Sequence, residues 1–286
     1  MSVHLLRPER TAAVSAALLE GRALAGGTDL LVQLRAGAVA GVMVDVTNLA
    51  DAPAPVTSTE LDGAAAVVLS AVTPLTDIAG ALGDRFGALR QAVDVFASEQ
   101  IRNRATLGGN LVTGSPAADT VPALVAAGAL VDLTSQDGDR TVPIGDFLLG
   151  PRRVDLRPAE WVRTVTVPLP PGSSGFRKVG GRRALAISYL NLAWQWRRDE
   201  AGRLRDVRLA MGSVAPTVVR LHHAEAALEG RAPVVDAIAD AAAATAEDIS
   251  PIDDLRASQT YRRRAAAGLL TEVLHSTATT SQEEDR

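Results

Sequence analysis

The sequence predicts a protein of mixed helix and strand, built from a larger first part and a smaller second part. Strand-like runs alternate with helix-like runs through about the first 170 residues. A stretch rich in proline, glycine and serine, Pro170–Gly175, then marks the boundary between the parts. Beyond it, two long strand-like runs precede three helix-like runs, so strands and helices no longer alternate.

Each element of the first part is predicted from an apolar run and the residues that begin or end it. Runs with helical spacing are bounded by glycine or by a capping residue, whereas short β-branched runs have the length of strands. Ser115 would cap the last helix of this part, with Pro116 in its first position, although Pro122 threatens a kink. In chain order we expect a helix over 9–21, a strand over 22–26, a helix over 28–37 with Thr28 as its N-cap, strands over 41–49 and 65–72, and helices over 73–82, 84–97 and 115–128.

Turn-forming residues predict two strand pairs farther along the chain. Residues 129–147 contain two strand-like runs around Gln136–Asp139, which is a strong hairpin signal. A strand begins at Glu160 and leads into the boundary, and residues 185–214 form two long strands joined at Asp199–Gly202. The remaining expectations are helices over 217–229, 233–248 and 260–275, and a disordered, low-complexity tail over 277–286.

The composition limits the classes of function. The chain has no cysteine, which excludes disulfides, iron–sulfur ligation and a thiolate zinc site of its own. Acidic and basic residues are interspersed at a net charge of −4, and aromatic residues make up 3%, which disfavours nucleic-acid binding. We see no signal-peptide core and no apolar run of the roughly 20 residues that span a bilayer, so we expect a cytoplasmic protein.

Common catalytic and nucleotide-binding motifs are absent from the sequence. Neither G-x-G-x-x-G after a strand nor the P-loop pattern occurs, which argues against a Rossmann dehydrogenase and a P-loop NTPase. The four histidines lack metal-binding spacing, and no G-x-S-x-G elbow supplies a nucleophile. We therefore expect no metal ligand and no catalytic acid, base or nucleophile in this chain.

Two glycine pairs, Gly26–Gly27 and Gly108–Gly109, are the strongest candidates for a binding site. A polar residue follows each pair at once, Thr28 or Asn110, and a helix-like run comes next. Glycine allows positive φ angles and leaves no Cβ between the backbone and a ligand, and the N–H groups at a helix start favour an anion. From these residues alone two interpretations remain open: two ordinary tight turns, or two halves of one diphosphate site.

Five longer stretches extend this pattern over nearly the whole chain: "AGGTDLL", "IRNRATLGGN…SPAADTVPAL", "GRRALAISYLNLA", "LAMGSVAPTVVR" and "DDLRASQTYRRR". Together they resemble the FAD-binding, or medium, subunit of the molybdenum hydroxylases, a family that includes xanthine dehydrogenases and aerobic carbon monoxide dehydrogenase. The resemblance implies an α+β fold. A vanillyl-alcohol-oxidase-like (PCMH-type) FAD-binding domain of two α+β subdomains would span 1–172. A C-terminal domain of the CO dehydrogenase flavoprotein type, an antiparallel sheet with helices, would span 176–276.

The resemblance also implies which residues contact FAD. The two glycine segments would bind the pyrophosphate, with Asn110 near the phosphates or the ribityl chain, while Phe96 would lie at the adenine end. Asp119 would contact a sugar hydroxyl and Lys178 the flavin ring, and the match at Val162 and Arg163 is in ambiguous register. The full set of implied cofactor-binding residues is Leu24, Ala25, Gly26, Gly27, Thr28, Asp29, Leu30, Phe96, Thr106, Leu107, Gly108, Gly109, Asn110, Ser115, Asp119, Val162, Arg163 and Lys178.

The function implied by the resemblance is electron transfer within a larger complex. The FAD of this oxidoreductase subunit would accept electrons from an iron–sulfur (2Fe–2S) small subunit and pass them to NAD+, a quinone or oxygen. The hydroxylated substrate would react at a molybdopterin-binding large subunit, and the complex would be a dimer of heterotrimers. With no cysteine, and no histidine near either glycine pair, FAD would be bound non-covalently. The alternatives are a stand-alone FAD-dependent oxidoreductase acting directly on a small molecule, and a non-catalytic binding module.

Overall fold

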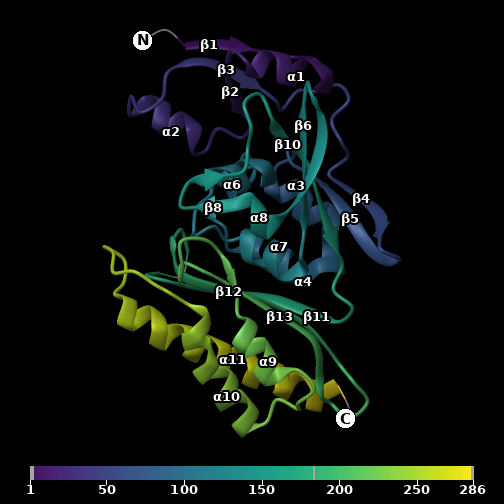
Figure 1. Cartoon of the computed structure of the whole chain (residues 1–286), viewed down its shortest axis with the longest axis vertical. Helices are drawn as coiled ribbons and strands as arrows, with labels where there is room; N and C mark the ends of the chain where they lie inside the picture. Colours follow the sequence, from purple (N-terminus) through teal and green to yellow (C-terminus); the bar gives the residue numbers. More distant parts are fainter. Residues whose placement is uncertain (1–2, 183, 285–286) are drawn as a thin grey trace. The chain divides into compact units, whose positions relative to one another are not determined.

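The computed structural model describes residues 3–182 and 184–284, and Figure 1 traces the chain from the N-terminus to the C-terminus. The chain divides into two compact units, neither of which is continuous in sequence. Unit 1 comprises Met1–Gly83, Ala97–Ser115 and Gly128–Leu169, and unit 2 comprises Asp84–Phe96, Pro116–Ala127 and Pro170–Arg286. Two segments from the first half of the sequence therefore pack with the C-terminal residues.

Unit 1 begins with a three-stranded parallel sheet in the order β1-β3-β2. Its elements are β1 (Val3–Leu6), α1 (Thr11–Leu18), β2 (Gly21–Leu24), α2 (Leu30–Arg35) and β3 (Gly41–Asp45). Its core is made of Val14, Val44, Val46, Leu49, Val72 and Trp161. The predicted helix, strand, helix and strand are confirmed here, with one correction: α2 has Asp29 and not Thr28 as its N-cap residue.

The rest of unit 1 is built on a five-stranded antiparallel sheet in the order β4-β5-β10-β6-β7. Its elements are β4 (Val56–Leu61), β5 (Ala64–Ser70), α3 (Leu75–Leu82), α5 (Glu99–Arg102), α6 (Leu107–Thr113), β6 (Leu130–Ser135), β7 (Gly138–Pro143), α8 (Ile144–Phe147), β8 (Leu148–Gly150), β9 (Arg153–Val154) and β10 (Trp161–Pro168). The predicted hairpin is confirmed, because β6 and β7 pair through a two-residue loop. The β4–β5 hairpin turns at Asp62–Gly63, where both residues have positive φ as two-residue turns of this type require.

Unit 2 is an antiparallel sheet in the order β11-β12-β13-β14 with helices on both faces, as Figure 1 shows. Its elements are α4 (Gly87–Asp94), α7 (Val121–Ala127), β11 (Ser173–Gly180), β12 (Ser188–Arg198), β13 (Leu204–Gly212), β14 (Val219–Arg220), α9 (His222–Leu228), α10 (Val235–Asp248) and α11 (Gln259–Glu284), and the short 3₁₀ turn η1 (Gly83–Phe86) precedes α4. Leu190, Leu192, Trp194 and Trp196 alternate along β12 and belong to the main core of this unit. Both faces of β12 are covered, which explains why its sequence is almost continuously buried.

Several predicted helix boundaries differ from the structure in unit 2. The helix expected over 217–229 begins only at His222, after β14, and the helix expected over 84–97 is the turn η1 followed by α4. The helix expected from Ser115 begins only at Val121, because the carbonyls of Pro116 and Ala118 accept hydrogen bonds from Ser213 N and the Asn191 amide instead. Pro122 therefore lies in the first turn of α7, where proline removes no helical hydrogen bond. At the other end of the chain, α11 extends to Glu284 and includes most of the segment expected to be a disordered tail.

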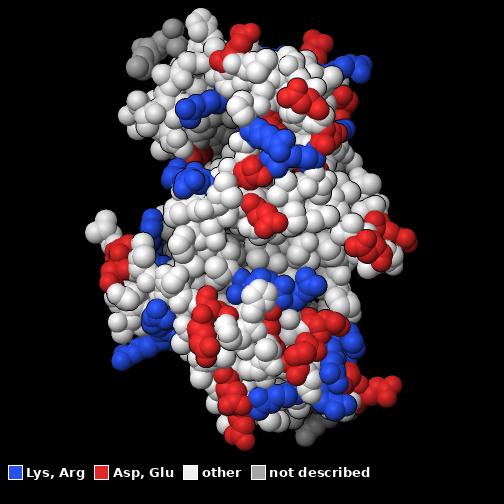
Figure 2. All heavy atoms as spheres, in the orientation of Figure 1, with Lys and Arg blue, Asp and Glu red and all other residues white. Residues whose placement is uncertain are grey.

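The surface charges and the apolar helices agree with the expectations from the composition. Acidic and basic side chains are interspersed over the face shown in Figure 2. Among the described residues, no helix combines the length and the apolar character needed to cross a membrane.

Candidate functional site

The first glycine pair packs in unit 1 against the backbone that leads into the second glycine segment. A Cβ atom added to Gly26 would lie 1.9 Å from the Arg104 carbonyl oxygen and 3.0 Å from the Ala105 Cα. No side chain fits in that space, so glycine is required where the first segment meets the backbone that leads into Thr106. The structure therefore brings together the segments that the sequence presents as two halves of one site.

The first glycine segment offers backbone donors. It links β2 to α2, is half-buried throughout residues 24–30, and has Gly27 at a φ of +73°. Within the described residues, the N–H groups of Gly26, Gly27 and Thr28 donate to no protein acceptor. Successive backbone N–H groups around a positive-φ residue form a concave anion-binding nest. These three N–H groups are therefore available to an anion.

The second glycine segment lies within a helix, which corrects the sequence-based expectation of a loop before a helix. Gly108 and Gly109 lie in the first turn of α6, whose N-cap is Thr106. Gly108 N donates to Ala71 O at 2.8 Å, and Gly109 N donates to Thr106 Oγ1 at 3.1 Å. A Cβ on Gly108 would lie 2.8 Å from Ala71, whereas one on Gly109 would meet only the Thr106 hydroxyl, at 3.0 Å. Gly108 is thus needed for packing, and Gly109 keeps an exposed surface free of side chain.

Among the other predicted residues of unit 1, Arg163 is linked to the second glycine segment through the backbone of Ala71. Arg163 lies in the β10 bulge, and its carbonyl accepts a hydrogen bond from Ala71 N, so the bulge connects through Ala71 to Gly108. Val162 beside it is buried, and Ser115, just after the end of α6, is half-buried.

Arg152 is a charged residue that the sequence analysis missed. Its backbone N donates to Gly114 O at the end of α6, and its guanidinium lies 3.7 Å from the Asp29 carboxylate in the first glycine segment. It has the positive φ of +57° that is unusual for a residue other than glycine. No spacing motif in the sequence could have indicated it, because its position depends on the loop between β8 and β9.

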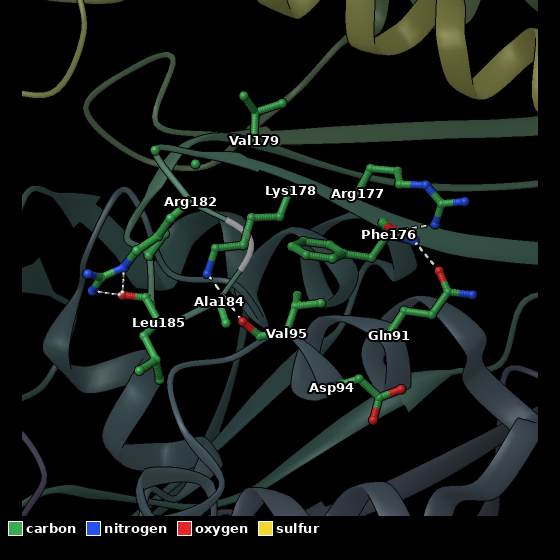
Figure 3. Close-up of a pocket in the computed structure, with 13 residues that line it drawn as sticks. Gln91, Asp94, Val95, Phe176, Arg177, Lys178, Val179, Arg182, Ala184 and Leu185 are labelled. Atoms are coloured by element: carbon green, nitrogen blue, oxygen red, sulfur yellow. Dashed lines mark hydrogen bonds between the residues drawn. The ribbon is translucent and has the colours of Figure 1, made fainter.

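Asp119 and Lys178, predicted to contact different parts of FAD, form an ion pair with each other in unit 2. Lys178 Nζ lies 2.6 Å from Asp119 Oδ2, and the two side chains are only 11% and 8% exposed. Lys178 also donates to Val95 O at 3.4 Å, a contact drawn in Figure 3. Phe96 follows Val95 in the chain and is half-buried at the end of the segment Asp84–Phe96, which contains α4. Unit 2 therefore gathers three of the predicted residues into one region.

A cavity of about 760 Å³ opens beside this ion pair (Figure 3). Its wall combines apolar side chains, such as Val95 and Leu185, with the cationic side chains of Lys178 and Arg182. Arg182 donates to Leu185 O at 2.6 Å, and both residues line the cavity. In the described part of the chain, no group of three or more histidine, aspartate or glutamate side chains could hold a metal ion.

Comparison with known proteins finds relatives over nearly the whole length of the chain. Residues 2–170 match the family described as the FAD binding domain in molybdopterin dehydrogenase, and residues 176–277 match the CO dehydrogenase flavoprotein C-terminal domain. The xanthine dehydrogenase FAD-binding subunit of Escherichia coli O157:H7 is 33% identical over 249 residues, which are 85% of this chain and 84% of that protein. The carbon monoxide dehydrogenase medium chain of Hydrogenophaga pseudoflava is 28% identical over 73% of this chain and 74% of that one.

A solved structure agrees with these matches. The carbon monoxide dehydrogenase of Hydrogenophaga pseudoflava lacking the Mo-pyranopterin moiety of the molybdenum cofactor superimposes with a TM-score of 0.86. The alignment has 27% identity and covers 95% of this chain and 96% of that chain. The implied fold class is thereby confirmed. The chain belongs to the FAD-binding medium subunits of the molybdenum hydroxylase family, which are subunits of oxidoreductases.

Proposed function

We propose that this chain holds FAD non-covalently and relays electrons from an iron–sulfur partner subunit to a terminal acceptor, NAD+, a quinone or oxygen. Hydroxylation of the substrate would take place at a molybdopterin-binding partner. The proposal rests on the close packing of Gly26 against the Arg104 carbonyl, just before the second glycine segment. The first segment has three backbone N–H groups without a protein acceptor, and Gly109 in the second leaves a surface free of side chain. The relatives named as medium chains support the presence of partner subunits.

The residues of unit 1 fit the diphosphate of FAD. A diphosphate needs several donors at once, and the N–H groups of Gly26, Gly27 and Thr28 supply them without a lysine or a metal ion. Gly109 leaves room for the backbone to approach a phosphate closely, since its missing Cβ would point into open space apart from the Thr106 hydroxyl. FAD, when bound, supplies the redox chemistry, and the protein supplies binding, orientation and electrostatics.

In unit 2 we propose that Asp119 and Lys178 keep the roles implied by the family, toward a sugar hydroxyl and the flavin ring. Their ion pair changes the electrostatic expectation. The positive charge of Lys178 is balanced by a buried carboxylate at 2.6 Å, so the pair acts on its surroundings as a dipole and not as a lone cation. The polarity of the cofactor's environment then depends on both residues.

Replacing Lys178 by methionine is expected to leave FAD bound and to lower its reduction potential by tens of millivolts. The change leaves the negative charge of Asp119 uncompensated, and this charge disfavours the reduced flavin, which is more negative than the oxidised one. A shift of about 30 mV corresponds to about 1.4 kcal/mol for a two-electron couple. Potentiometric titration of the flavin absorbance measures the shift. The double variant Lys178→Met/Asp119→Asn is the control, because removing both charges should return the potential toward that of the unmodified protein. An unchanged potential in Lys178→Met would remove this lysine from the flavin environment.

The proposed relay is tested on the chain purified through an affinity tag from its native host. A yellow preparation that absorbs near about 450 nm and releases FAD on denaturation is expected, as for protein-bound flavins. Iron, acid-labile sulfide and molybdenum should co-purify in fixed proportion with two further chains. A flavoprotein that purifies alone, without these elements, would favour the stand-alone oxidoreductase. Mixing the reduced protein with NAD+, a quinone or oxygen then identifies the acceptor.

A further inference from the structure

We propose that Asn191 is a positioning residue that holds the Asp119–Lys178 pair in the geometry in which it meets the cofactor. The inference rests on the proposed function, because it takes Asp119 and Lys178 to face FAD. Asn191 lies in the first half of β12 and is completely buried. Nothing in the sequence analysis assigned it a role.

Asp119 is a buried carboxylate whose two oxygens are both occupied. Oδ2 receives Lys178 Nζ at 2.6 Å, and Oδ1 receives the Ser188 hydroxyl at 2.6 Å and the Asn191 amide at 3.1 Å. A buried charge is stable only when it is paired and hydrogen-bonded. The oxygen that faces away from Lys178 is therefore held by Ser188 and Asn191, and these two donors decide how the carboxylate is oriented.

The backbone around Asp119 cannot fix this orientation by itself. Residues 114–120 form neither helix nor strand, so no ladder of backbone hydrogen bonds sets their path. The Asn191 amide nitrogen also donates to Ala118 O at 3.2 Å, next to Asp119 in the chain. One side chain of the sheet thus holds both the backbone before Asp119 and the carboxylate itself.

The opposite end of the Asn191 amide is fixed to β13. Gly212 N donates to Asn191 Oδ1 at 3.0 Å, which also determines which atom of the amide is oxygen. A Cβ on Gly212 would lie 2.3 Å from that oxygen and 3.0 Å from Pro116 O. The bare backbone of Gly212 is therefore what lets Asn191 and the 116–119 segment pack so closely. This is a second, independent sign that the site is built around the amide.

The test compares two amide-to-carboxylate changes on the same strand. Asn191→Asp keeps the shape of the side chain and the oxygen that accepts from Gly212 N–H. It removes the donor to Asp119 and Ala118, and it adds a second carboxylate beside Asp119. Gln195→Glu is the matched control, since Gln195 is also buried on β12 and its Oε1 has no hydrogen-bond partner among the described residues. The readouts are the FAD dissociation constant by fluorescence titration, the visible flavin spectrum and the melting temperature.

Asn191→Asp should weaken FAD binding at least about tenfold and shift the visible flavin bands, as expected for one charge-assisted hydrogen bond lost and a like charge added. Gln195→Glu should change the melting temperature but leave the dissociation constant within about twofold and the spectrum unchanged. Equal losses of affinity in both variants, or an unchanged affinity and spectrum in Asn191→Asp, would overturn the proposal.

Two further measurements keep the proposal testable. If Asn191→Asp does not fold, Asn191→Ala removes the amide donor to Asp119 and Ala118 without adding a charge. An unchanged spectrum and affinity in Asn191→Ala would also overturn the proposal. If the unmodified chain binds no FAD, the proposed function fails. If the unmodified chain binds FAD normally and only the Asn191 prediction fails, the proposed function stands and the positioning role is lost.

Discussion

Replacing Gly109 by valine is expected to abolish FAD retention while the fold stays intact. Gly109 has ordinary helical backbone angles in α6, so a side chain there needs no unusual φ. Its Cβ would meet only the Thr106 hydroxyl, at 3.0 Å, and the branched side chain would extend over the surface at which we place the diphosphate. We expect FAD affinity to fall at least about a hundredfold, or by about 2.8 kcal/mol. Flavin content after purification and FAD titration of the apo protein measure the loss.

Gly108→Ala is the matched comparison for Gly109→Val. Its added methyl group would lie 2.8 Å from both the Cβ and the carbonyl oxygen of Ala71, so it disturbs packing inside unit 1. We expect Gly108→Ala to lower the melting temperature and Gly109→Val to lower flavin content with little change in melting temperature. Full FAD occupancy in Gly109→Val would show that the second glycine segment does not contact the cofactor.

Replacing Arg262 by methionine is expected to give a large loss of stability in unit 2. Arg262 lies near the start of α11 and is only 3% exposed. Its guanidinium donates to Tyr189 O at 2.7 Å, to Ser213 O at 2.6 Å and to Asp254 Oδ1 at 2.9 Å. Methionine fills similar space but takes this donor away from the buried Ser213 carbonyl and the half-buried Tyr189 carbonyl, and removes the cation beside Asp254, which together cost on the order of 3 kcal/mol. Thermal unfolding should show a fall in Tm on the order of 10 °C.

Arg264→Met is the control for Arg262→Met, because Arg264 is two residues away on the same helix and is exposed. It should change Tm by no more than about 2 °C, as surface substitutions do. If the two variants melted at the same temperature, the buried guanidinium would contribute nothing to stability.

The same cluster predicts a pH dependence of stability. Burial would raise the pKa of Asp254, but the N–H groups of Arg256 and Ala257 and the Arg262 guanidinium outweigh it and bring the pKa to about 2, below its ordinary value of 3.8. A carboxyl group with a lowered folded-state pKa stabilises the fold above its unfolded-state pKa. This contribution is therefore complete above about pH 4 and is lost as the pH falls toward about 2. In Arg262→Met, unfolding measured across this pH window should depend less steeply on pH.

Much of the fold could be predicted because its signals are local. The β6–β7 hairpin and the long strands β12 and β13 follow from turn residues between apolar runs, and all of them were found where expected. Strand β11 could not be predicted, because its residues are rich in glycine and serine and lack apolar alternation. It exists because it pairs with β12 along its length and because Gln91 Oε1 accepts a hydrogen bond from Phe176 N on its outer edge. Such support comes from residues far away in the chain.

The candidate site shows the same division. The sequence by itself determined the two glycine pairs, the absence of cysteine, and the family, because these depend on residue identity and spacing. Only the tertiary structure decided that Gly26 packs on the Arg104 carbonyl and that the Gly108 and Gly109 N–H groups are already used within the protein. Likewise, only folding brings Asp119 into contact with Lys178, which is 59 residues away in the sequence. Only the folded structure shows that α7 begins at Val121 and not at Ser115. The reason is that these features rest on hydrogen bonds between distant segments, which compete with and override local preferences for turns and helices.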